Sequence, residues 1–136
     1  MKEIILEKGK KLYFASDNHL GAPTYKESRE REVRFVHWLD TIKADAGALF
    51  LLGDLFDFWF EYKTVVPRGF VRVLGKLAEL KDSGLPIFFF VGNHDLWMSD
   101  YFEQELGIPV YYRPQEFLCH GKRFLIGHGD GLGPGD

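Results

Sequence analysis

The sequence contains few of the features that mark several broad classes of protein. Cys119 is the only cysteine among 136 residues, so an intrachain disulfide cannot form and a reducing compartment is compatible. The net charge is −3, which gives no reason to expect nucleic acid as a partner. No apolar run approaches the ~20 residues that span a bilayer, and the N-terminal run is too short for a signal peptide. We therefore expect a cytoplasmic protein, soluble or peripherally attached to a membrane.

What the sequence does contain is an alternation of apolar runs and amphipathic segments. Continuous apolar runs at 48–52 and 87–91 predict buried strands, and the runs at 4–6 and 12–15 predict a hairpin or two successive strands. Apolar periodicity predicts helices over 27–42 and 70–80 and a weaker one over 96–106. A final hairpin is predicted from 116–119 and 123–126. This alternation indicates one α/β domain with a parallel sheet, whose ligand site lies at the carboxyl ends of the strands.

Four short clusters of Asp, His and Asn each follow a predicted strand, and we expect them to converge on one rim of the sheet. Oxygen and nitrogen ligands without thiolates suit Mn, Fe, Zn or Mg, and a pair of such cations can catalyse displacement at phosphorus. Gly53 lets the backbone turn sharply, so that Asp54 can project into the rim and bridge two cations. The clusters read Asp17-Asn18-His19, Gly53-Asp54-Leu55-Phe56-Asp57, Gly92-Asn93-His94-Asp95 and Gly127-His128-Gly129-Asp130.

These four motifs, in this order and along the whole chain, closely resemble the calcineurin-like metallophosphoesterases. The runs Asp-Leu-Phe-Asp-Phe-Trp at 54–59 and His-Gly-Asp-Gly-Leu-Gly-Pro-Gly-Asp at 128–136 are most similar to the UDP-2,3-diacylglucosamine pyrophosphatases of lipid A synthesis. The resemblance implies a layered αββα sandwich and two divalent metal ions, Mn first among them. It also implies a nucleotide-sugar lipid substrate, UDP-2,3-diacylglucosamine, cleaved to UMP and lipid X, with peripheral contact to the inner membrane.

The resemblance also implies a role for each polar residue of the rim. His94 would face the substrate phosphate as a charge stabiliser or proton donor, and Asp95 would orient it; a merely hydrogen-bonded His94 is the alternative. Those pyrophosphatases often have Arg at the position of His94, and His there is the general family pattern. The implied metal ligands are Asp17 and His19 for the first ion, Asp54 as the bridge, and Asn93 and His128 for the second ion.

Three residues are weaker candidates for substrate contacts. Trp59, in Phe58-Trp59-Phe60, would either wall an acyl-chain groove or belong to the core. Lys63 and Arg68 would either meet the pyrophosphate or lie in solvent at the start of a helix. Two other functions stay open: a phosphoesterase that acts on nucleotides or phosphodiesters, and a non-catalytic scaffold of the same fold.

The family pattern continues past the fourth cluster to a His-x-His motif that completes both metals, and this chain contains no His-x-His. We therefore expect residues 1–136 to be the N-terminal part of one metallophosphoesterase domain, with the second sheet largely missing and activity impaired. Such a piece would expose a sheet edge and apolar faces, which predicts a homodimer or a swapped assembly.

Overall fold

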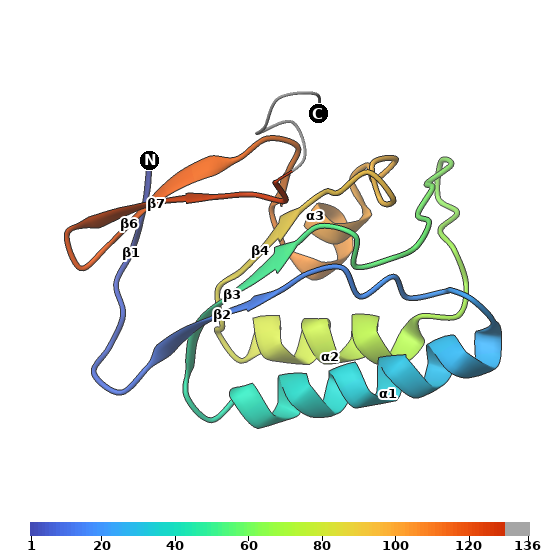
Figure 1. Ribbon diagram of the computed structural model, residues 1–136, viewed down its shortest axis with the longest axis horizontal. Helices are drawn as coiled ribbons and strands as arrows, with labels where there is room; N and C mark the ends of the chain where they lie inside the picture. The colour runs from blue at the N-terminus through green and yellow to red at the C-terminus, as the bar shows by residue number, and fades with distance from the viewer. Residues whose placement is uncertain (130–136) are drawn as a thin grey trace.

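The computed structural model describes residues 1–129, which form alternating strands and helices (Figure 1). The helices lie close to the predicted periodic segments, and the strands lie close to the apolar runs. In chain order the elements are β1 (Lys2–Ile4), β2 (Lys11–Ala15), α1 (Tyr25–Ile42), β3 (Ala46–Leu52), α2 (Val71–Asp82), β4 (Ile87–Phe90), α3 (Tyr101–Leu106), β5 (Val110–Tyr111), β6 (Gln115–Cys119) and β7 (Lys122–Ile126).

The main sheet has four strands in the order β2-β3-β4-β5, and every neighbouring pair is parallel, as predicted. Strand β3 is apolar throughout because both of its faces are covered. Leu49 and Leu51 pack in the core beneath the helices, whereas Ala48 and Phe50 pack against the second sheet. Figure 1 shows α1 and α2 side by side on one face of this sheet and the β6–β7 hairpin beyond the other.

The second sheet has three strands in the order β1-β6-β7. As the sequence predicted, β6 and β7 form a hairpin. The hairpin turns through His120 and Gly121, both with positive φ. Strands β1 and β2 belong to different sheets, so the alternative of an N-terminal hairpin is wrong. The layered α/β architecture is confirmed, and the second sheet is incomplete: within residues 1–129 no helix covers its outer face, and Leu125 on β7 is 66% exposed.

Side-chain oxygens accept hydrogen bonds from the first turns of α1 and α2. Thr24 Oγ1 accepts from the Glu27 N–H at 3.2 Å and caps α1. The carboxylate of Glu32, buried on α1, accepts from the Val73 N–H at 3.0 Å and so caps α2 from the neighbouring helix. No helix within residues 1–129 is both long enough and apolar enough to cross a membrane.

Helix α3 is shorter than predicted, and β5 was not predicted. The helix starts at Tyr101 because the chain before it is held as a loop: Glu61 accepts hydrogen bonds from the N–H groups of Ser99 and Tyr101, at 2.9 and 3.1 Å. Strand β5 has only two residues, too few to give a sequence pattern.

Candidate metal centre

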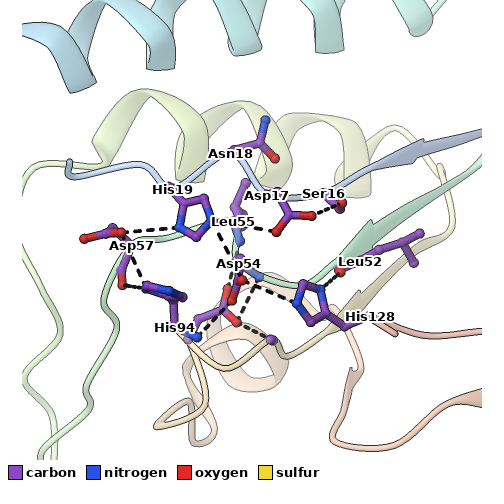
Figure 2. Close-up of polar contacts among 12 residues, drawn as sticks. Ser16, Asp17, Asn18, His19, Leu52, Asp54, Leu55, Asp57, His94 and His128 are labelled. Atoms are coloured by element: carbon purple, nitrogen blue, oxygen red, sulfur yellow. Dashed lines mark hydrogen bonds and ion pairs between the residues drawn. The ribbon is translucent and has the colours of Figure 1, made fainter. Parts of the chain in front are cut away.

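The four polar clusters converge beyond the carboxyl ends of β2, β3, β4 and β7, as the sequence predicted. Figure 2 shows Asp54 at the centre, with His19 and His94 on one side and His128 on the other. His128 therefore reaches from the second sheet to the main sheet, and its Nε2 lies 3.3 Å from Asp54 Oδ2. Asp130, the last residue of the fourth cluster, lies outside the described residues.

Two glycines make room for the side chains of Asp54 and His128. A Cβ on Gly92 would lie well inside van der Waals contact of Asp54 Oδ1, and a Cβ on Gly53 would collide with the ring of His128. Gly53 also has φ +91°, in the left-handed region that favours glycine, and Asp54 follows with φ +53°. The Gly-Asp pair after β3 is therefore what turns the carboxylate into the rim.

Asp54 is the carboxylate that two groups of donors share. It is 3% exposed, and its Oδ1 accepts from the His94 N–H at 2.8 Å. One group joins Asp54 to His19 and His94, and the other joins it to Asp17 and His128; within each group the donor atoms lie within 4.8 Å of one another. Asp17 Oδ1 is also 3.7 Å from His19 Nε2, so Asp17 is near both groups. A buried carboxylate common to both groups fits a bridging ligand between two cations.

The ring of His128 is oriented for a cation. Its Nδ1 lies 2.6 Å from the carbonyl oxygen of Leu52, and because a carbonyl can only accept, Nδ1 carries the proton. The other ring nitrogen, Nε2, faces the carboxylate of Asp54. A backbone bond at one ring nitrogen that leaves the other for a metal is the usual orientation of histidine ligands.

Asn93 also lies against Asp54. With its amide nitrogen turned to the carboxylate, it donates to Oδ1 and Oδ2 at 3.3 and 3.0 Å; turned over, it offers its oxygen to a cation shared with Asp54. The donor set of carboxylate, imidazole and amide therefore fits hard or borderline divalent cations. Asp17, His19, Asp54, Asn93 and His128 all lie at this rim, and their assignment to individual metal ions stays a prediction.

Asp57 links the two histidines on the other side of Asp54. Its Oδ1 lies 3.3 Å from His19 Nδ1 and 3.5 Å from His94 Nδ1, and its carbonyl oxygen accepts from His94 Nδ1 at 2.9 Å. The rings of His19 and His94 meet edge to face, with centroids 4.6 Å apart. Asp57 thus fixes the tautomer of His94, with the proton on Nδ1 and Nε2 as the remaining site for proton exchange.

Asp95 does not have the role that was expected of it. Its fully buried carboxylate accepts from four backbone N–H groups, and the His94 ring that it was expected to orient is held by Asp57 instead. Burial raises the pKa of Asp95 above its ordinary value, and the backbone hydrogen bonds oppose this shift. The reason for the correction is geometric: Asp95 fastens the loop after β3 to the loop after β4. Its donors are Gly92 at 2.6 Å, Leu55 at 2.9 Å, Asp54 at 3.2 Å and Phe56 at 3.5 Å.

The expectation that Trp59 contacts substrate is wrong, because Trp59 is 0% exposed. It packs on the rings of Phe56, Phe70 and Phe102, and its indole N–H donates to Glu61 at 2.9 Å. The alternative, that it belongs to the core, is confirmed. Its neighbours in sequence are the exposed ones: Phe58 is 61% exposed and Phe60 is 46% exposed.

The two predicted basic contacts lie in different places. Arg68 lines a hollow beside the rim together with Asp57, Phe58 and Tyr25. The ammonium of Lys63 lies over the ring of Tyr62, 5.3 Å from its centroid, in the turn closed by Tyr62 and Val65. The structure therefore brings Arg68, rather than Lys63, next to a residue that contacts both histidines.

The comparisons with known proteins agree with this geometry. Residues 10–132 match the model of the calcineurin-like phosphoesterase family. The chain is 48% identical over 120 residues to a UDP-2,3-diacylglucosamine hydrolase from Porphyromonas gingivalis, covering 88% of this chain and 46% of that protein. It is 35% identical to the protein of that name from Ectopseudomonas mendocina, covering 86% and 46%, and 32% identical to one from Histophilus somni, covering 90% and 50%.

The chain spans about half the length of the curated relatives it matches. The family match, by contrast, takes in nearly the whole chain, including all four clusters of the rim. The chain therefore belongs to the calcineurin-like phosphoesterase family.

Proposed function

We propose that this chain acts as a metal-dependent phosphohydrolase that cleaves the pyrophosphate of UDP-2,3-diacylglucosamine. Water adds to one phosphorus, the bridging P–O bond breaks, and the products are UMP and lipid X. The observation that carries the proposal is Asp54, a buried carboxylate shared by two groups of metal-ligand type. The substrate is inferred from the names of the relatives, one of which is 48% identical over 120 residues.

Asp17, His19, Asp54, Asn93 and His128 would hold two divalent cations, and we propose Mn²⁺ as the native metal. When bound, the cations would supply Lewis-acid stabilisation of the phosphoryl oxygens as negative charge develops on them. The support for Mn²⁺ is the kind of donor at the rim: carboxylate, imidazole and amide groups, without thiolates.

His94 is the residue that we propose to act on the reacting phosphate. Its Nδ1 is held by the carbonyl of Asp57, its N–H is held by Asp54, and its side chain is 43% exposed. The ring is therefore fixed at one nitrogen and accessible to a ligand. Protonated at Nε2, it would donate a hydrogen bond to a phosphoryl oxygen and offset the charge of the leaving phosphate.

Other parts of the substrate would lie beside the rim. Arg68, which lines a hollow with Asp57, would meet a phosphate, and the exposed rings of Phe58, Phe60 and Trp97 would contact acyl chains or the surface of a membrane. We further propose a cytoplasmic protein in peripheral contact with the inner membrane. The exposed face of the incomplete second sheet favours a homodimer or swapped assembly of this chain.

The test is release of UMP from UDP-2,3-diacylglucosamine by the purified chain, with Mn²⁺ and with a chelator. We expect Mn²⁺-dependent turnover, slower than that of the longer Porphyromonas gingivalis relative, that falls at least about 100-fold in Asp54→Asn because the shared ligand is lost. Asp82→Asn is the matched control, since Asp82 is an exposed carboxylate at the end of α2. No UMP release, or a rate that neither chelation nor Asp54→Asn changes, would refute the proposal.

A further inference from the structure

The segment that presents Asp17 and His19 has an unusual backbone. Both residues have positive φ, 58° and 47°, in the left-handed region that non-glycine residues rarely adopt. Such conformations persist only where the surroundings fix them. On one side, the N–H groups of Asp17, His19 and Leu20 donate to the carbonyls of residues 53–55, at 3.1, 2.9 and 2.9 Å.

The carbonyl groups of this segment point the other way, towards α1, where Arg31 donates hydrogen bonds to them. Nη1 of Arg31 donates to the carbonyl of Asn18 at 2.5 Å, and Nη2 donates to the carbonyls of His19, at 3.0 Å, and Ala22. One planar guanidinium thus holds three backbone oxygens within five residues. The loop after β3 thus accepts hydrogen bonds from the N–H groups of the segment, and Arg31 donates hydrogen bonds to its carbonyl groups.

We propose that Arg31 is a positioning residue of the metal centre, which holds the left-handed backbone of residues 17–19 so that Asp17 and His19 face Asp54. Its consequence for metal binding rests on the proposed function. Arginine is required because its fork of N–H donors can reach several carbonyls at once, whereas the single ammonium of lysine cannot span them. The contribution is geometric and does not depend on the net charge of the helix.

Arg34 offers a matched control on the same helix. It lies one turn further along α1 and lines the same small hollow as Asp17, Asn18 and Arg31. Replacing either arginine by lysine keeps the charge at that place. Only Arg31→Lys removes the fork that holds the three carbonyls, so any difference between the two variants reports geometry.

Two measurements on the purified chain separate the backbone role from its consequence. The first is amide hydrogen exchange of residues 17–20, followed by NMR in a chelator, which needs no metal. The second is the dissociation constant for Mn²⁺ by calorimetric titration. We expect Arg31→Lys to speed exchange of these amides at least about 10-fold and to weaken Mn²⁺ binding about 10-fold or more, the range found for residues that orient metal ligands. Arg34→Lys should change neither.

Unchanged exchange in Arg31→Lys would overturn the proposal, whether or not the chain binds Mn²⁺. Faster exchange with unchanged Mn²⁺ affinity would also overturn it, and so would equally faster exchange of the β3 and β4 amides, which would mean general loosening of the fold. If the wild-type chain took up no Mn²⁺ but exchange at residues 17–20 still rose only in Arg31→Lys, the backbone role would be supported and the proposed metal-dependent function would be refuted.

Discussion

Replacing Asp95 by Asn tests the claim that this carboxylate holds the rim together. The change keeps the size of the side chain but exchanges one acceptor oxygen for an NH₂ donor. In the wild type, Oδ1 accepts from Asp54 and Gly92, and Oδ2 accepts from Leu55 and Phe56. Whichever way the amide turns, its nitrogen faces two buried N–H groups that then have no acceptor.

The magnitude follows from those two lost acceptors. A buried polar group left without a partner costs about 1–3 kcal/mol, so the two together should lower the free energy of unfolding of Asp95→Asn by about 2–6 kcal/mol. That is a large share of the roughly 5–15 kcal/mol by which a domain is stable. If Asp95 served only to orient His94, the change would affect activity but not stability.

The assay is urea unfolding followed by circular dichroism, in a chelator so that metal binding does not contribute. Asp82→Asn, at an exposed position, serves as the control and should stay within about 0.5 kcal/mol of the wild type. An Asp95→Asn variant as stable as this control would show that the four hydrogen bonds do not support the fold, and the reasoning would fail.

Two further predictions concern the same region. Trp59→Ala should cost about 3–5 kcal/mol in the same assay, whereas Phe58→Ala should cost less than about 0.5. Gly92→Ala should push Asp54 aside and weaken Mn²⁺ binding at least about 10-fold in a calorimetric titration, and unchanged affinity would contradict the geometry of the rim.

The convergence of the polar clusters could be predicted because it depends on the backbone. An apolar run that ends in a polar cluster is a buried strand followed by a loop, and parallel strands place such loops at one edge. Asp54 followed from this reasoning, since Gly53 gives the turn that aims it. His128 was predicted at the rim by the same reasoning, because its cluster follows the predicted strand at 123–126, although that strand lies in the second sheet.

The direction of individual side chains could not be predicted in the same way. Trp59 is buried while Phe58 and Phe60 are exposed, and three aromatic residues in a row do not indicate which one points inward. A β-bridge between Phe60 and Trp97 holds this segment extended, so neighbouring residues alternate between core and solvent. That bridge joins residues far apart in the chain, so no local sequence pattern indicates it.

The same limit explains the error over Asp95 and the absence of Arg31 from the predicted site. Both side chains bind backbone groups of other loops, and backbone groups carry no sequence signal. An acceptor for four N–H groups and a donor to three carbonyls look, in the sequence, like an ordinary acidic and an ordinary basic residue. Sequence therefore indicated which side chains gather at the rim better than it indicated which side chains hold them in place.

The loop after β3 is the part of the rim on which the other loops depend. Its carbonyls hold the segment of Asp17 and His19, its N–H groups bind Asp95, and the side chain of Asp54 accepts from the N–H of His94. These are mostly backbone bonds that persist without a cation, so they can hold carboxylates of like charge close together against their repulsion. A cation that binds there would remove the repulsion without having to build the site, and it would stabilise the folded chain in proportion to its affinity. Apart from Asp54, which belongs to both, the residues that hold the rim and the residues proposed to bind metal are separate sets, so substitutions in one should be separable by measurement from substitutions in the other.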